Sequence, residues 1–297
     1  MRTAPPAAPG PTVSLVVGSG SVKCAAALGV VKALNEADIG IDRVVGCSAG
    51  AIFATMVALG AKTEEARDAT MRLWSKDITS VRNTWGLLRV LAPRLFGFRA
   101  DNFGLRDDRL ILERLAGQFG DLRIEDTGIP LHITATDFAN GDLVEIDRGR
   151  IIDAIRASIS LPFAFAPVKL DGRLLVDGYL ADPLPVSVAM KHGARVIVAV
   201  GFESPYQENV RSAGRYAFQL SAIMSNNLLK SRFAFHSVAH HSEVIAILPE
   251  FKQRIRLFDT EKIPYIIDEG EQAARAQLAY LRRLLDETQE QARQGNA

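Results

Sequence analysis

Short apolar runs alternate with Ala- and Leu-rich segments in the first part of the chain. The β-branched, apolar run 12–17 ends at Gly18 and predicts a buried strand, and residues 22–37 have helical spacing. Residues 43–46 predict a second strand, and residues 49–59 predict a second helix. Strands that alternate with helices favour a parallel sheet covered on both faces. We therefore expect an α/β fold with three layers, α/β/α, and a mostly parallel central sheet.

The remaining pattern predicts further strands and helices without an internal repeat or a linker. In chain order these are a charged, mainly helical stretch at 63–126, strands at 131–136 and 143–146 around a turn at 139–142, a helix at 151–158, a hairpin of 168–170 and 173–176, a strand at 195–201 and an amphipathic helix at 269–293. We expect one domain at 12–290, a disordered leader at 1–11 and a flexible tail at 291–297.

Charge and cysteine content exclude several classes of protein. The 297 residues include 35 Lys and Arg against 34 Asp and Glu, a formal charge of +1. So balanced a chain has no overall field to gather nucleic acid or an anionic bilayer, and we expect no nucleic-acid partner. Two cysteines cannot build a disulfide framework or a structural zinc site. The leader lacks the apolar region of a signal peptide, which predicts a cytoplasmic protein.

One uncharged stretch has the length of a membrane span. Residues 44–61 contain no charged side chain, but Gly46, Ser48 and Gly50 fall in the first half. A buried strand, a tight turn and a helix fit this pattern better than a membrane helix does.

The same stretch contains a candidate nucleophile. Residues 46–50 read Gly-Cys-Ser-Ala-Gly, which matches G-x-S-x-G between a predicted strand and a predicted helix. A serine at such a turn projects its Oγ, and small neighbours let other chain segments approach closely. The motif points to Ser48 as a nucleophile, with Gly46 and Gly50 as its motif glycines. The competing interpretation is a tight turn that happens to contain serine.

A serine hydroxyl needs a base to become a good nucleophile. In an α/β-hydrolase the order is Ser, then Asp, then His, and the late histidines of this chain are His192, His236, His240 and His241. That fold places several strands before its nucleophile, whereas one strand and one helix precede Ser48 here. The strand count therefore argues against an α/β-hydrolase.

A glycine-rich loop follows the first predicted strand. Residues 18–23 read Gly-Ser-Gly-Ser-Val-Lys, so Lys23 occupies the third glycine position of a dinucleotide loop, and a P-loop motif is absent. The alternative is a loop whose backbone N–H groups face an anion, which beside a serine turn forms an oxyanion hole. A turn capped by Ser21 is the remaining interpretation.

An acidic residue ends another predicted strand. Asp177 follows an apolar run and is followed by Gly178, then by Asp-Pro-Leu-Pro at 182–185. An isolated Asp-Gly pair usually marks a turn. The donor loop, the serine motif and this Asp-Gly pair, in this order, resemble the patatin-like phospholipases, especially their compact bacterial members. The stretch 156–167 (RASISLPFAFAP) also resembles the family, and the resemblance spans about residues 13–202.

The resemblance implies the roles of the site residues. Ser48 and Asp177 would form a catalytic Ser–Asp dyad that needs no histidine, no cofactor and no metal. The oxyanion and substrate-binding loop would comprise Ser19, Gly20, Ser21 and Lys23 after Gly18. Lys23 would stabilise charge or shape the loop; a solvated lysine in a first helical turn is the competing interpretation.

The loop departs from the family pattern. Serines and Cys24 stand where glycine is more usual, and Lys23 replaces the more frequent arginine. We expect Cys24 to occupy a position that favours positive φ, where a side chain strains the backbone.

The implied function is a serine acyl hydrolase of the phospholipase A or lysophospholipase type that cleaves fatty-acyl esters of phospholipids through an acyl-enzyme. The alternatives are an acyltransferase on a similar core and a catalytically weak lipid-binding regulatory protein. The segment 84–98, in which Trp, Leu and Phe alternate with arginines, fits either peripheral membrane contact or a helix that covers the core.

Overall fold

The computed structural model describes residues 12–74, 77, 83, 97, 99–204, 206, 209–239 and 243–294. The expected leader 1–11 and nearly all of the segment 84–98 lie outside the described residues, as do residues 295–297 of the expected tail.

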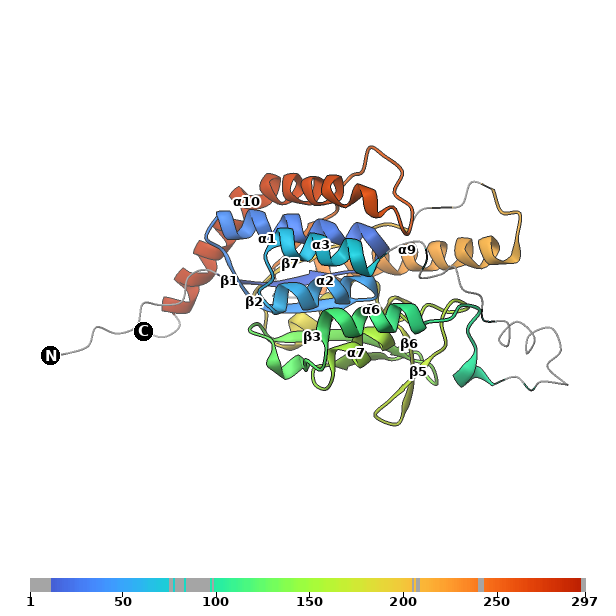
Figure 1. Cartoon of the computed structure of the whole chain (residues 1–297). Coiled ribbons are helices and arrows are strands. Elements are labelled where there is room, and N and C mark those ends of the chain that lie inside the picture. The colour runs from blue at the N-terminus through green and yellow to red at the C-terminus, as the bar shows by residue number, and fades with distance from the viewer. Residues whose placement is uncertain are drawn as a thin grey trace.

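Eight strands form one sheet in the described part of the chain (Figure 1). They are β1 (Thr12–Val17), β2 (Gly40–Cys47), β3 (Leu131–Asp137), β4 (Leu143–Ile146), β5 (Val168–Leu170), β6 (Arg173–Asp177), β7 (Val196–Val200) and β8 (Glu243–Ile247). The order is β5-β6-β3-β2-β1-β7-β8, and β4 pairs with β3. Strands β3, β2, β1, β7 and β8 run parallel, whereas β4, β5 and β6 add antiparallel pairs. The sheet is therefore mixed, with a parallel centre as predicted.

Helices cover both faces of this sheet. The described helices are α1 (Ala26–Glu36), α2 (Ala49–Ala58), α3 (Thr63–Leu73), α6 (Arg109–Phe119), α7 (Ile151–Ser158), α8 (Val186–Lys191), α9 (Ala213–Ala239) and α10 (Ile263–Gln294). Helices α1, α2, α3, α6, α7 and α10 contribute to the larger apolar core with one face of the sheet. Helix α8 and Leu229 of α9 contribute to a smaller core with Val16 and Val45 on the other face. The three-layer α/β/α prediction is confirmed.

Two parts of the fold differ from the sequence prediction. Helix α9 and strand β8 were not predicted. The final helix begins at Ile263 rather than at residue 269, although Pro264 looks like a helix breaker, and it runs through Gln294. Proline is tolerated in the first turn of a helix because its missing N–H would have no intrahelical partner there.

The uncharged stretch 44–61 is the end of β2, a turn and α2, as the buried interpretation predicts. Within the described residues, no helix combines the length and the apolar character that a membrane crossing requires.

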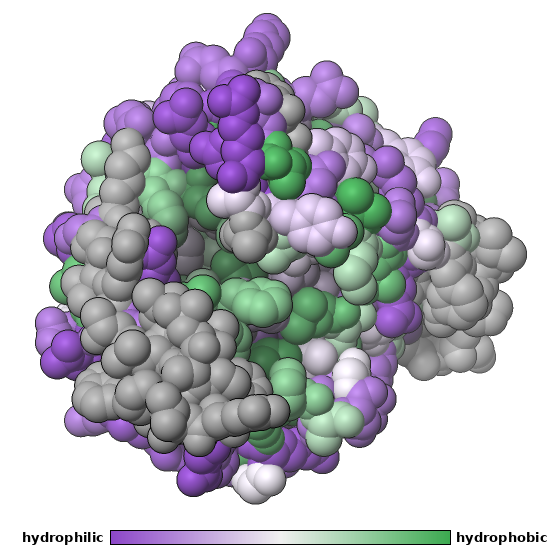
Figure 2. Space-filling model, turned by 90° about the vertical axis from the view of Figure 1, so that its right-hand side faces the viewer, coloured by the Kyte–Doolittle hydropathy of each residue, from purple (hydrophilic) through white to green (hydrophobic). Residues whose placement is uncertain are grey.

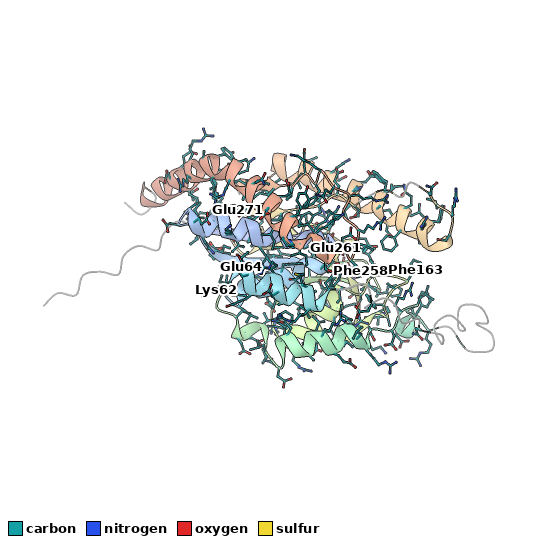
Figure 3. All side chains as sticks on the ribbon, turned by 45° about the horizontal axis from the view of Figure 1, so that its top comes forward. Lys62, Glu64, Phe163, Phe258, Glu261 and Glu271 are labelled. Carbon is teal, nitrogen blue, oxygen red and sulfur yellow. The ribbon has the colours of Figure 1, made fainter. Side chains whose placement is uncertain are left out.

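Helices α1 and α10 cross at a contact between backbones. A Cβ added at Gly29 would lie 1.9 Å from the Ile267 carbonyl oxygen, and one added at Gly270 would lie 2.1 Å from the Ala26 carbonyl oxygen. Lys32 and Glu271 form an ion pair of 2.8 Å beside this crossing, and Figure 3 labels Glu271 on α10. Because these two glycines have no side chain, the backbones of α1 and α10 can cross at this short distance.

We predict that Gly29→Ala destabilises the fold, because the new methyl group forces α1 away from α10. Overpacking of this kind costs about 1–3 kcal/mol. Gly117→Ala in α6 is the matched control, since a Cβ there meets nothing within 4 Å. The control should gain about 0.5–1 kcal/mol from better helix propensity. Urea unfolding followed by circular dichroism measures both changes, and equal midpoints for the two variants would contradict the close crossing.

Candidate active site

Ser48 stands at a sharp turn between β2 and α2. Its backbone has φ 55° and ψ −131°, a left-handed conformation that side chains rarely adopt. The Ser48 N–H donates to Ser158 Oγ at 2.8 Å, and Ser158 Oγ donates to the Thr134 carbonyl at 2.7 Å. The strained turn is thus held by a side chain from the end of α7. Ser48 itself is half-buried.

The two glycines of the serine motif are required by close packing. A Cβ at Gly46 would lie 2.6 Å from Ala51 Cα, because α2 folds back onto β2. A Cβ at Gly50 would lie 2.4 Å from the Gly18 carbonyl oxygen. The second glycine therefore lets the start of α2 contact the glycine-rich loop directly, and it brings Ser48 beside that loop.

Asp177 is the hydrogen-bond partner of Ser48. It ends β6, and its Oδ2 accepts a hydrogen bond of 2.7 Å from Ser48 Oγ. Its Oδ1 accepts the Tyr179 N–H at 3.1 Å. A Cβ at Gly178 would lie 2.6 Å from the Thr134 carbonyl oxygen, so glycine lets the chain pass close to β3 at this point. The structure therefore brings together the two residues predicted as a dyad.

Burial dominates the electrostatics of Asp177. The side chain is 1% exposed, and this desolvation raises its pKa to about 7 against the lowering effect of the Tyr179 and Ser48 hydrogen bonds. A carboxylate with an ordinary pKa is a weak base at neutral pH. Asp177 is a stronger base that is still ionised in a useful fraction at neutral pH.

Two backbone N–H groups of the glycine-rich loop form hydrogen bonds with backbone carbonyls of the fold. The Gly18 N–H donates to the Val200 carbonyl at 2.9 Å, and the Ser19 N–H donates to the Pro183 carbonyl at 2.8 Å. Gly20 precedes the 3-10 helix η1 (Ser21–Ala25), and Ser21 begins it. The first N–H groups of a helix have no intrahelical acceptor. Gly20 and Ser21 are therefore the candidate oxyanion donors, and Ser19 is a structural member of the loop.

The loop residue in the left-handed region is Ser21, with φ 55°. Cys24 was expected there, and this prediction is wrong: Cys24 lies inside η1, fully buried, with its Sγ 3.2 Å from the Gly18 carbonyl oxygen. Ser21 Oγ donates to the Leu257 carbonyl, and the Trp74 indole N–H donates to that carbonyl at 2.9 Å. The serine substitution thus anchors the loop to a distant part of the chain.

Lys23 is fixed by contacts with the fold. Its Nζ donates to the Glu203 carbonyl at 2.9 Å and lies 6.0 Å from the centre of the Phe251 ring. Partial burial lowers the pKa of Lys23. These contacts favour a role in shaping the loop over the solvated lysine considered from the sequence.

The sequence match to known proteins decides the family. The family model for patatin-like phospholipases matches residues 15–190, more than half of the chain. The chain belongs to the patatin-like phospholipase family. It is 32% identical over 229 residues to an uncharacterised NTE family protein of Mycobacterium tuberculosis, a match that covers 77% of this chain and 59% of that protein. It is 28% identical over 207 residues to human patatin-like phospholipase domain-containing protein 6, covering 69% and 14% of the two chains.

Two solved structures are also similar to this patatin-like chain. VipD of Legionella pneumophila has a TM-score of 0.47 at 15% identity, covering 94% of this chain and 67% of VipD. The type III effector ExoU has a TM-score of 0.40 at 18% identity, covering 93% and 54%. Family membership rests on the sequence match and not on these structural likenesses. The chain spans about three fifths of the mycobacterial relative and about a seventh of the human one.

Sequence reasoning missed the residues that position the dyad. Ser160 accepts the Asp177 N–H on its carbonyl at 3.0 Å, and Arg156 donates to Ser160 Oγ at 2.6 Å. Arg156 is buried and forms an ion pair with Asp108. The stretch Arg-Ala-Ser-Ile-Ser was noticed only as a point of resemblance. The signal in it was an arginine and two serines at the end of a short apolar helix, because buried polar groups are costly unless they form hydrogen bonds.

The raised pKa of Asp177 predicts a pH-dependent stability. In the unfolded chain the carboxyl has its ordinary value of 3.8, and in the fold it has about 7. Because the folded state binds this proton more tightly, ionisation destabilises the fold increasingly as pH rises from about 4 to 7, by on the order of 4 kcal/mol in all. Asp177→Asn removes this cost. The stability of the variant relative to wild type should therefore rise between pH 4 and 7 and level off above.

Urea unfolding at a series of pH values checks this difference. Asp171→Asn is the control, because Asp171 is an exposed turn residue whose positive φ suits asparagine. Its stability should follow that of wild type at every pH. If the free energy of unfolding of wild type and of Asp177→Asn changed with pH in the same way, this result would contradict the raised pKa of Asp177.

Proposed function

We propose that the protein is a serine acyl hydrolase that releases fatty acids from phospholipid or lysophospholipid esters through a Ser48–Asp177 dyad. The observation that carries the proposal is the 2.7 Å hydrogen bond between Ser48 Oγ and a buried carboxylate, at a turn with the G-x-S-x-G sequence. Family membership supports lipid acyl hydrolysis in general terms. The dyad, the substrate class and the acyl-enzyme are our proposal.

In the first half of the reaction Ser48 Oγ attacks the ester carbonyl carbon while its proton moves to Asp177 Oδ2. The new C–O bond gives a tetrahedral intermediate whose oxyanion accepts hydrogen bonds from the backbone of Gly20 and Ser21. The intermediate collapses, the bond to the alcohol breaks, and the alcohol oxygen takes the proton from Asp177. The products are the deacylated lipid alcohol and an acyl-enzyme on Ser48.

In the second half water attacks the acyl carbon and gives its proton to Asp177. Collapse of the second intermediate returns that proton to Ser48 Oγ and releases the fatty acid. Asp177 thus acts as base and acid in turn, which a carboxyl with a pKa of about 7 can do at neutral pH.

Neither of the two histidines whose side chains are described, His132 and His192, contacts this serine through a hydrogen bond. His132 and His192 contact Glu145, at 2.8 Å and 2.5 Å, and neither hydrogen-bonds Ser48 or Asp177 within the described residues. Asp182, the other buried carboxyl in this part of the chain, accepts the Leu184 N–H at 3.1 Å. These contacts favour the dyad over the histidine-dependent alternatives.

Exposed apolar side chains lie at the end of the molecule where β1 and β2 finish. Leu180 follows Asp177 closely in the chain and is exposed, as are Phe163, Leu248 and Leu257. Figure 2 looks onto the end of the molecule where β1 and β2 finish and shows hydrophobic residues gathered at its centre within a hydrophilic margin. Phe163 and Phe258 are labelled at this end in Figure 3. Such a surface suits acyl chains better than it suits a polar ester.

We further propose that this protein is cytoplasmic and that it meets its substrate at a membrane surface. The exposed apolar side chains described above support this proposal. The segment 84–98 considered from the sequence lies almost wholly outside the described residues and adds no structural support.

Fatty-acid release from phosphatidylcholine and lysophosphatidylcholine in mixed micelles tests the proposal. Wild type should release fatty acid, and Ser48→Ala and Asp177→Asn should each lose at least about 1,000-fold in rate, because each removes one member of a catalytic unit. Ser187→Ala, on α8, is the matched serine control and should keep the wild-type rate.

The same assay separates the alternatives when an alcohol or lysolipid acceptor is added. Transfer of the acyl group to the acceptor in preference to water identifies an acyltransferase. Binding of lipid micelles without any product identifies a lipid-binding protein. Fatty-acid release that survives Ser48→Ala would contradict the dyad.

A further inference from the structure

Three potential metal ligands from separate parts of the chain meet on the face of the sheet that α8 covers. His132 lies in β3, Glu145 in β4, and His192 directly follows α8. Residue 132 pairs in register with Val45 of the smaller core, which places the His132 side chain on that core's face. Glu145 pairs with Thr134 on the neighbouring strand, and the cluster therefore joins β3, β4 and α8.

The two imidazoles converge on one carboxylate oxygen. His132 Nδ1 lies 2.8 Å from Glu145 Oε1, and His192 Nε2 lies 2.5 Å from the same oxygen. The ring centroids are 4.4 Å apart and the rings are inclined by 34°. The three ligand atoms all lie within 4.8 Å of one another. Ligand atoms around a tetrahedral zinc at about 2.0–2.2 Å stand about 3.4 Å apart, so small side-chain movements would suffice.

One of these imidazole nitrogens lacks a hydrogen bond. His132 is 7% exposed, and its Nδ1 makes no hydrogen bond among the described residues, despite its short distance to Glu145. A buried polar atom without a hydrogen bond costs about 1–3 kcal/mol. A cation placed between the two rings and the carboxylate would give this nitrogen a partner.

We propose that His132, Glu145 and His192 bind a divalent transition-metal ion of the zinc class. Two imidazoles and one carboxylate are the donor set of many such sites, with remaining positions open to water. His192 is partly exposed and gives the ion a path from solvent.

The neighbouring Lys191 fixes the orientation of the Glu145 carboxylate. Lys191 Nζ lies 2.8 Å from Glu145 Oε2, so that oxygen is occupied and Oε1 faces the imidazoles. A partner of this kind orients a metal ligand from outside the coordination sphere. The ion would therefore bind one oxygen of Glu145.

This site is separate from the proposed reaction. None of its three ligands hydrogen-bonds Ser48 or Asp177 in the described structure, and no step of the proposed ester hydrolysis uses them. The sequence predicted no metal, because the three ligands are far apart along the chain and only the fold assembles them. A bound ion would tie the β3–β4 hairpin to α8 and so stabilise the fold.

Zinc titration of the untagged full-length chain by isothermal calorimetry, with thermal unfolding in parallel, tests the proposal. We expect one Zn²⁺ per chain and a raised melting temperature. His192→Gln should weaken binding at least about tenfold and remove the thermal shift, because it removes a ligand at a partly exposed position. Glu145→Gln should have the same effect.

The other histidines of the chain, His236, His240 and His241, supply the control. Their triple replacement by glutamine should keep the affinity and the thermal shift. Co²⁺ in place of Zn²⁺ should give a visible d–d spectrum with wild type and lose it with His192→Gln. Absence of Zn²⁺ binding to wild type would overturn the proposal, as would binding that survives His192→Gln and is lost in the triple variant.

Discussion

The hydrogen bond between Ser48 and Asp177 joins two strands that are not neighbours. Ser48 follows β2 and Asp177 ends β6, and β3 lies between these strands in the sheet. The contact therefore has to pass over the end of β3. Gly178 makes this passage, because any side chain there would meet the Thr134 carbonyl oxygen at 2.6 Å. The dyad geometry depends on this one close approach.

A single segment holds both members of the proposed dyad. At the end of α7, Ser158 accepts the N–H of Ser48, and the next residue but one, Ser160, accepts the N–H of Asp177. Arg156 fixes Ser160 and is itself paired with Asp108. The strained backbone of Ser48 is thus stabilised by contacts outside its own turn, as a strained residue requires. The same burial that makes these hydrogen bonds strong raises the pKa of Asp177.

The sequence pattern predicted those elements whose bounds are determined by residues close together in the chain. The bounds of α7 and β4 were predicted to the residue, because each is a short apolar pattern closed by turn residues. The need for small residues in the serine motif was also predicted, since a Cβ added at Gly46 or Gly50 would lie less than 3 Å from neighbouring backbone atoms.

The parts that failed depend on distant contacts. The first turns of α10, from Ile263 to Asp268, were missed, and there Ile263, Ile266 and Ile267 are buried in the larger core. Ser21 carries the positive φ in place of Cys24, since its hydroxyl is bound to Leu257 more than two hundred positions away. The contacts of Ser158 and His132 involve partners from other strands and helices, which no local pattern shows.

The central claim is that a buried Asp177 activates Ser48 directly. The rate at which a fluorophosphonate probe labels Ser48, measured across pH with peptide mapping of the adduct, tests it. The account predicts labelling that rises with pH around a midpoint near 7, the pKa of Asp177, and that nearly vanishes in Asp177→Asn. A labelling rate that is independent of pH, or that is unchanged in Asp177→Asn, would contradict it.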